Sequence, residues 1–172
     1  WRRRIVILLA VAIKAGQLDT EPMLLTQYAE ELGVYSETQK TEAFSWIRAN
    51  RDKLGNIGAN PDLVQKNYTI LVYRGDSLLF WSNTKVLPRA KDLAAFKDKA
   101  GSFALRLPLG WFVLNQENLG SDRGLVLIPI RYHSDTRAGS GNGPFPANGG
   151  ITAAVAISET KTAYPVQIDG KD

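Results

Sequence analysis

Few residues in this chain could perform bond-breaking chemistry, and they do not form a catalytic set. His133 is the only histidine and cysteine is absent, which excludes thiol nucleophiles, disulfides and zinc sites built on thiolates. Glu117, Asp122 and Asp135 could flank a cation or a scissile bond, but carboxylates in loops are usually solvated. We therefore predict that this chain is not an enzyme and holds no catalytic residue, metal or cofactor.

Two tryptophans, Trp81 and Trp111, are the best candidates for binding a ligand. Large aromatic side chains line ligand pockets, but they also fill cores, and a core role is the simpler interpretation for tryptophan on a strand. Arg74-Gly75-Asp76 spells an adhesion tripeptide. Glycine and aspartate favour a tight turn, so we interpret it as the turn of a hairpin.

A long amphipathic helix precedes the candidate residues. Apolar residues recur at helical spacing from about Asp19 to Leu54, with charged residues on the opposite face. Asp19 or Thr20 can cap its start. Ser36 and Gln39 have capping-box spacing, so a break and restart of the helix at this point is a plausible alternative.

The rest of the chain predicts an antiparallel sheet with one further helix, an α+β fold. We expect a hairpin of residues 68–73 and 78–82, a short helix over 89–100, and a strand from Phe103 to Leu107. Residues 111–115 and 125–132 should pair across a polar loop, 116–124. Pro129 then requires an edge position or a bulge, because proline cannot donate to the ladder. After a glycine- and proline-rich connection at 133–150, two more strands are expected, at 151–157 and 164–168, and all strands fit a single sheet.

The amino terminus carries most of the net charge of +4, because Arg2, Arg3 and Arg4 precede an apolar run from Ile5 to Ile13. The remainder is nearly neutral, so the high pI does not predict nucleic-acid binding. The run is shorter than the roughly 20 residues that span a bilayer. Its arginine flank nevertheless favours a shortened membrane segment over a short buried helix or strand. We therefore divide the chain into a membrane-proximal segment, residues 1–18, and one sensor domain, residues 19–172.

The strand motifs resemble the extracytoplasmic sensor region of bacterial membrane-bound histidine kinases. The likeness lies in Val72-Tyr73, the Gly-Asp-Ser turn and the strand that closes with Phe80-Trp81-Ser82-Asn83. It continues in Leu109-Gly110-Trp111-Phe112 and in the run from Gly124 to Tyr132. The resemblance is good over residues 68–132, thin over 151–171 and vague before Lys66. It departs from the family pattern at 133–150, where glycine and proline replace an asparagine-rich helical segment.

The resemblance implies a PAS/Cache-like domain, with a long N-terminal helix packed on an antiparallel sheet, exposed outside the inner membrane in the periplasm. Its partner would be a small-molecule or protein signal, and a homodimer is possible. The pocket of such a sheet would lie on the face covered by residues 89–101. The expected ligand-binding residues are Tyr73, Trp81, Arg106, Trp111 and Arg131. The alternative is a membrane-anchored structural or binding protein, such as a pilin-like subunit.

Overall fold

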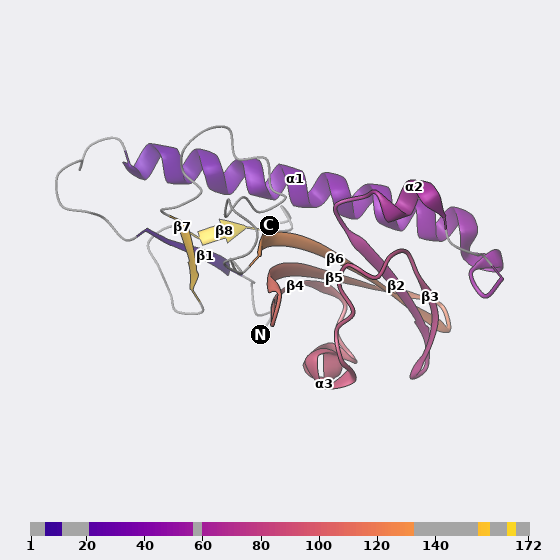
Figure 1. The fold of residues 1–172 in the computed structure, drawn as a ribbon. Helices are drawn as coiled ribbons and strands as arrows, with labels where there is room; N and C mark the ends of the chain where they lie inside the picture. The colour runs from indigo at the N-terminus through magenta and orange to yellow at the C-terminus, as the bar shows by residue number, and fades with distance from the viewer. Residues whose placement is uncertain (1–5, 12–20, 57–59, 133–154, 159–164, 168–172) are drawn as a thin grey trace.

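The computed structural model describes residues 6–11, 21–56, 60–132, 155–158 and 165–167. One long helix lies along one face of a five-stranded antiparallel sheet, and a short helical segment lies below the opposite face (Figure 1). This arrangement confirms the predicted α+β fold with a long helix packed on an antiparallel sheet. Among the described residues, no helix is both long and apolar enough to cross a bilayer.

Helix α1 runs without a break from Glu21 to Asn50. The predicted break at Ser36 is absent because the side chain of Ser36 is buried and does not cap a new helix. The helix ends where Asn50 leaves helical geometry, and the chain continues as a 3-10 turn, Arg51–Lys53. A short helix that the sequence did not predict follows, α2 (Pro61–Val64). Asn60 caps it by accepting hydrogen bonds from the backbone amides of residues 62 and 63.

The main sheet has the order β3-β2-β6-β5-β4. Its strands are β2 (Thr69–Arg74), β3 (Ser77–Trp81), β4 (Gly101–Leu107), β5 (Gly110–Leu119) and β6 (Asp122–Tyr132). The β2–β3 hairpin turns at Gly75, whose φ of +57° suits glycine, as predicted. Every neighbouring pair is antiparallel.

The predicted polar loop at 116–124 is wrong. Strands β5 and β6 continue through it and meet at a tight turn formed by Gly120 and Ser121, where Gly120 has φ +69°. Pro129 lies at a bulge, because the register passes from Trp111↔Arg131 to Phe112↔Pro129. It also lies beyond the last β6 residue that pairs with β2, Leu127. The bulge alternative for this proline is therefore confirmed.

Both faces of the sheet are covered, and each has its own core. The helix-side core joins Phe44 and Ile47 of α1 to alternate residues of the sheet, including Val113 and Val126. The segment-side core contains the other set of alternate sheet residues, including Leu114, and is covered by residues 89–100, here called the covering segment. A strand buried on both faces reads as a continuous apolar run, as the sequence of β6 does.

The covering segment contains α3 (Ala90–Leu93) and a 3-10 turn, Ala94–Phe96. It is shorter than the helix predicted over 89–100. Arg89 and Asp92 close its start, because the Asp92 carboxylate accepts hydrogen bonds from both the backbone and the guanidinium of Arg89. Leu93 and Phe96 face the sheet. Ala100 is exposed.

The strand-closing motif Trp81-Ser82-Asn83 fixes the chain after β3. Asn83 is buried and donates to the carbonyl of Tyr68 at 2.9 Å, while its side-chain oxygen accepts from Thr69 at 2.8 Å. The hydroxyl of Ser82 accepts the backbone N–H of residue 70 at 2.9 Å. These bonds satisfy buried polar groups, so the serine and asparagine of the motif have structural roles.

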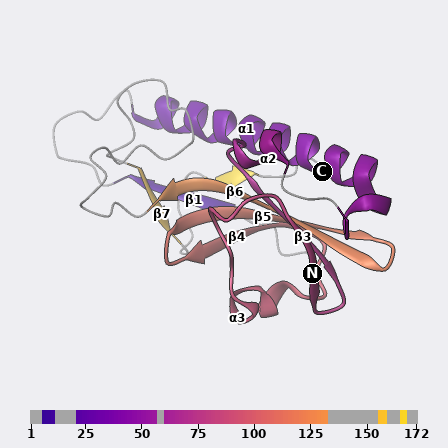
Figure 2. The same cartoon turned by 45° about the vertical axis from the view of Figure 1, so that its right-hand side comes forward.

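The prediction that all strands fit a single sheet is wrong, because three strands form a second, smaller sheet with the order β7-β1-β8. They are β1 (Val6–Val11), β7 (Val155–Ser158) and β8 (Pro165–Gln167), and β1 pairs antiparallel with both others. This sheet lies under the N-terminal part of α1 in both views (Figures 1 and 2). The apolar run at the amino terminus thus contains a strand. The prediction for residues 133–150 lies outside the described residues.

Candidate functional site

The structure divides four of the five expected ligand-binding residues, Tyr73, Trp81, Arg106 and Trp111, so that they do not share one site on the covered face. Tyr73 packs against the segment-side core, and Trp81 pairs with Leu71 at the edge strand, with 51% of its surface exposed. Trp111 packs against the helix-side core, and the guanidinium carbon of Arg106 lies 5.7 Å from the centre of its ring. Arg131 is the register partner of Trp111 on β6.

These five residues therefore do not line one site on the covered face. The reason is strand periodicity, since Trp111 and Arg106 alternate with Phe112 and Leu105, which face the covering segment. Among the four whose side chains are described, Tyr73 packs into the core below the covering segment.

A polar cluster at the end of the covered face holds the covering segment to the sheet. Gln116 of β5 is buried, and its side-chain nitrogen lies within hydrogen-bonding distance of the carbonyl oxygens of Phe96, at 2.9 Å, of Lys97 and of Lys99. These carbonyls lie at the end of the last helical turn of the segment, where the carbonyl of Phe96 also accepts the backbone N–H of Lys99 at 3.0 Å. One amide group thus fixes the end of the covering segment.

Arg123 of β6 contributes a second attachment. Its guanidinium donates to the carbonyl of Lys97 at 3.0 Å and lies over the ring of Tyr73, 5.3 Å from the ring centre. The register places Tyr73, Arg123 and Asn118 side by side on β2, β6 and β5. Gln116 lies two residues before Asn118 on the same face, so these side chains share one corner of the sheet.

Two buried polar atoms of this cluster have no hydrogen-bond partner among the described residues. They are the Nε of Arg123, a donor, and the Oε1 of Gln116, an acceptor. Both residues reach the same carbonyl, that of Lys97, so the two unpartnered atoms belong to one small region. Unpaired buried polar groups are costly and require an explanation.

Charged side chains of both signs surround this corner. Lys97 pairs with Asp76 at 2.7 Å, and this interaction lowers the pKa of the Asp76 carboxyl. Burial raises the pKa of the Tyr73 hydroxyl, against the opposing charge of Arg123, so this phenol stays neutral and can donate a hydrogen bond. The ammonium of Lys99 lies 5.7 Å from the centre of the Phe96 ring.

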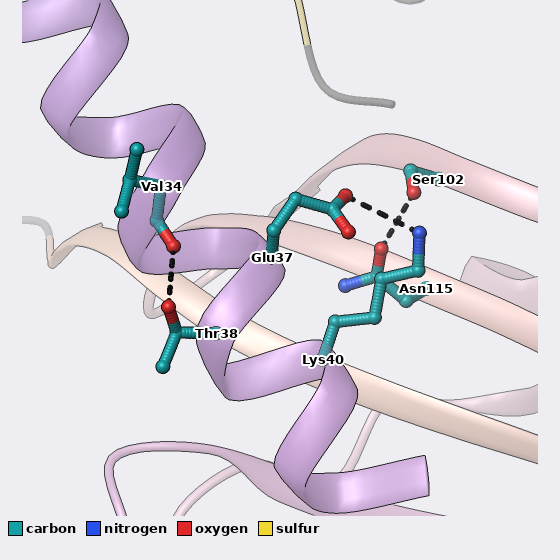
Figure 3. Close-up of polar contacts among 6 residues, drawn as sticks. All are labelled: Val34, Glu37, Thr38, Lys40, Ser102 and Asn115. Atoms are coloured by element: carbon teal, nitrogen blue, oxygen red, sulfur yellow. Dashed lines mark hydrogen bonds and ion pairs between the residues drawn. The ribbon is translucent and has the colours of Figure 1, made fainter. Parts of the chain in front are cut away.

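A second polar region lies between the middle of α1 and strands β4 and β5 (Figure 3). Lys40 extends from α1 toward the sheet and donates to Glu37 at 3.2 Å. Ser102 donates to Oδ1 of Asn115 at 2.6 Å, and both side chains are buried. The Nδ2 of Asn115 and the hydroxyl of Ser36 are buried without a partner among the described residues. Ser36 lies on the same helix face as Lys40.

The C-terminal half of α1 contacts the sheet through apolar side chains, unlike the polar region in the middle of the helix. A Cβ atom on Gly124 would come within 3.2 Å of Phe44 and 3.5 Å of Ile47, so the helix lies almost directly on the β6 backbone. Helix α1 therefore meets the sheet through a tight apolar contact at one end and a polar contact with unpartnered atoms in its middle.

Gln116 and Arg123 are not among the predicted site residues, because both fall in the segment that was expected to be a loop. The signal that could have found them is the alternation of Phe112, Leu114 and Gln116, which places the glutamine on the apolar face of a continuing strand. Among the described residues there is no group of three or more His, Cys, Asp or Glu residues that could hold a metal ion.

Comparison with models of protein families, with curated proteins and with solved structures gives no match to this chain. The resemblance to histidine kinase sensor regions therefore remains a prediction, and the function is inferred from the residues and their geometry.

Proposed function

We propose that this chain is the extracytoplasmic, periplasmic sensor domain of a bacterial membrane-bound sensor histidine kinase, anchored in the inner membrane. In this proposal the domain performs no chemistry itself. It responds to a small-molecule or protein signal and passes a change in the position of α1 to cytoplasmic kinase parts. The long helix on an antiparallel sheet is compatible with a PAS/Cache-like architecture.

The observation that carries this proposal is the unequal contact of α1 with the sheet. A signal can shift a protein between two arrangements only if it binds them with different affinity, and the element that moves must have an alternative position. The apolar contact at Gly124 suits a pivot. The polar contact around Ser36 and Asn115 leaves buried atoms unpartnered, and these atoms would gain hydrogen bonds to water if this part of the helix moved away from the sheet.

The pilin-like alternative requires the apolar amino-terminal run to be a helix. Residues Val6–Val11 form strand β1 instead, which disfavours a helix at this run in either kind of protein, so the sensor proposal does not depend on these residues as its anchor. Attachment to a membrane and the formation of a homodimer remain predictions of the sensor proposal.

The reading frame of the parent gene on both sides of this chain tests the proposal directly. A sensor kinase requires apolar spans of about 20 residues on both sides, followed by a helix pair with a phosphoacceptor histidine and an ATP-binding domain. A reading frame that encodes no phosphoacceptor helix pair and no ATP-binding domain would contradict the proposal. Catalytic turnover of a substrate by the isolated chain would also contradict it.

A further inference from the structure

We propose that the turn between β4 and β5 inserts into the surface of a bilayer that contains anionic lipids. The contact is made by Pro108 and Leu109 in the turn and by Arg106 and Trp111 directly behind it, together called the hairpin tip. This inference adds a lipid contact to the membrane-anchored sensor proposed above and rests on that proposal for its biological meaning. The contact itself can be measured on the isolated chain with lipid vesicles.

The first argument is an apolar side chain at the end of a hairpin. Leu109 lies in the two-residue turn that joins the register partners Leu107 and Gly110, and 52% of its surface is exposed. Glycine, proline, asparagine, aspartate and serine are the usual residues of tight turns, because each favours the turn conformation. Pro108 follows this rule, whereas leucine contributes nothing to the turn. A single exposed leucine is ordinary, so the neighbours of Leu109 decide what it can bind.

The second argument is the pair of residues directly behind the turn. Arg106 and Trp111 are cross-strand partners, and the guanidinium carbon of Arg106 lies 5.7 Å from the centre of the Trp111 ring. Arg106 is exposed, and among the described residues it forms no ion pair. Tryptophan is favoured at the boundary between hydrocarbon and headgroups, and a long arginine side chain can reach phosphate oxygens from an apolar surface. Leucine at the tip with tryptophan and arginine behind it thus matches the order of layers at a bilayer surface.

The third argument is the sign of the charge at this end of the sheet. The hairpin tip and the end of β6 lie together, because Gly110 is the register partner of the last residue of β6. Residues 101–116 and 124–132, which include the parts of these strands nearest the tip, contain two charged residues, Arg106 and Arg131, and no carboxylate. Cations near a bilayer are attracted to anionic headgroups, so the charge of this end complements an anionic lipid surface.

The size of the hairpin tip favours a lipid surface over a protein partner. A stable protein interface buries about 800 Å² on each partner, far more than one turn and one cross-strand pair present. A bilayer surface can take up a narrow apolar projection, because its headgroups are mobile. For a domain already held at the membrane a weak contact is sufficient, since the second attachment is intramolecular.

An environment-sensitive fluorophore on Leu109→Cys tests insertion at this position alone, because the chain has no other cysteine. We expect its emission to shift to the blue with vesicles of phosphatidylcholine and phosphatidylglycerol, and to stay unchanged with phosphatidylcholine alone. An equal response to both would overturn the inference. The same fluorophore on Ser77→Cys, an exposed position beside the hairpin turn at the opposite end of the sheet, should not respond.

Vesicle binding by unlabelled variants separates the hairpin tip from the general positive charge of the chain. Arg106→Gln should weaken partition onto phosphatidylglycerol vesicles about fivefold, because one cation close to an anionic surface contributes about that factor. Arg48→Gln removes an equal charge from a guanidinium on α1 that also lies over an aromatic ring, that of Phe44, and should have a much smaller effect. Equal effects of the two substitutions would show that net charge alone binds the vesicles and would overturn the inference.

A measurement on the wild-type chain covers the case in which a variant does not fold. The amide resonances of Leu109 and Gly110 should broaden in bicelles that contain phosphatidylglycerol and a lipid with a paramagnetic headgroup. Those of Gly75 and Asp76, in the turn at the opposite end of the sheet, should not.

Three further results would overturn the inference. They are an unshifted label at position 109 with anionic vesicles, equal broadening at both turns, and a label shift that rises with protein concentration in the absence of lipid. The last would assign the hairpin tip to a contact with a second copy of the chain. Each result leaves the sensor proposal intact, whereas a parent gene without kinase parts would remove that proposal and leave the measured lipid contact.

Discussion

At the residue scale, Gly124 sets the distance between α1 and the sheet. Replacement by alanine would place a Cβ atom 2.9 Å from Cδ1 of Leu119 and 3.2 Å from Phe44. Overpacking of this kind costs about 1–3 kcal/mol, and we expect about 1–2 kcal/mol because the Leu119 methyl can partly give way. Urea denaturation would measure the loss.

The matched control for Gly124→Ala is Gly55→Ala, because no atom lies within 4 Å of the added methyl at that position. It should leave the free energy of unfolding unchanged or raise it slightly, since alanine lowers the entropy of the unfolded chain. Equal effects of the two substitutions would show that α1 does not lie as close to β6 as described.

The carboxyl of Asp122 makes the free energy of unfolding depend on pH in the acid range. Its buried carboxyl accepts two hydrogen bonds from Arg74, at 2.8 and 3.1 Å, and this interaction lowers its pKa. A lowered folded-state pKa means that the stabilisation is present above the unfolded pKa of about 3.9 and is lost as pH falls through the folded pKa. We expect Asp122→Asn to cost about 1 kcal/mol at pH 7, because Arg74 itself is exposed.

The measurement for Asp122 is the free energy of unfolding of both proteins from pH 7 down to pH 2. The wild-type and Asp122→Asn curves should converge below pH 4. Parallel curves over the whole range would mean that another carboxyl determines the acid sensitivity.

At the element scale, Gln116 determines whether the covering segment stays on the sheet. Gln116→Ala removes the donor of three carbonyl interactions, so we expect the segment to open and global stability to fall by about 1–3 kcal/mol. Trypsin should then cut faster after Lys97 and Lys99, and hydrogen exchange there should rise. Asn118→Ala, an exposed position two residues along the same strand, is the control and should not change the cutting rate.

Local sequence patterns predicted some of the helices and strands and failed for others. Period-2 and helical patterns predicted α1, the first hairpin and β4 because their apolar faces repeat locally. They failed at 116–124, where polar residues continue a strand because Gln116 is paired with backbone from another part of the chain. Gln116 and Arg123 of the candidate site were missed for the same reason, whereas Tyr73 was among the expected residues. The residues of this site, Tyr73, Gln116 and Arg123, meet only through strand register and a distant segment.

At the scale of the whole molecule, unequal contacts predict that the N-terminal half of α1 moves more than its C-terminal half. The chain has no cysteine, so spin labels can be placed uniquely. A label pair at Val34→Cys and Leu109→Cys, both exposed positions, should give a broad or two-peaked distance distribution. A pair at Ala49→Cys and Leu109→Cys should give a single narrow peak, because Ala49 lies beside the tight contact. Equally narrow distributions would contradict a pivoting helix.

The small sheet has a mechanical consequence. Strand β1 runs antiparallel to β8, and Val6 is paired with Gln167 at one end of that ladder. A force that drew the chain before residue 6 away from the chain after residue 167 would act on this end and part the backbone hydrogen bonds one at a time. Tension between these two stretches would therefore peel β8 from β1 at low load, before the five-stranded sheet bears any of it.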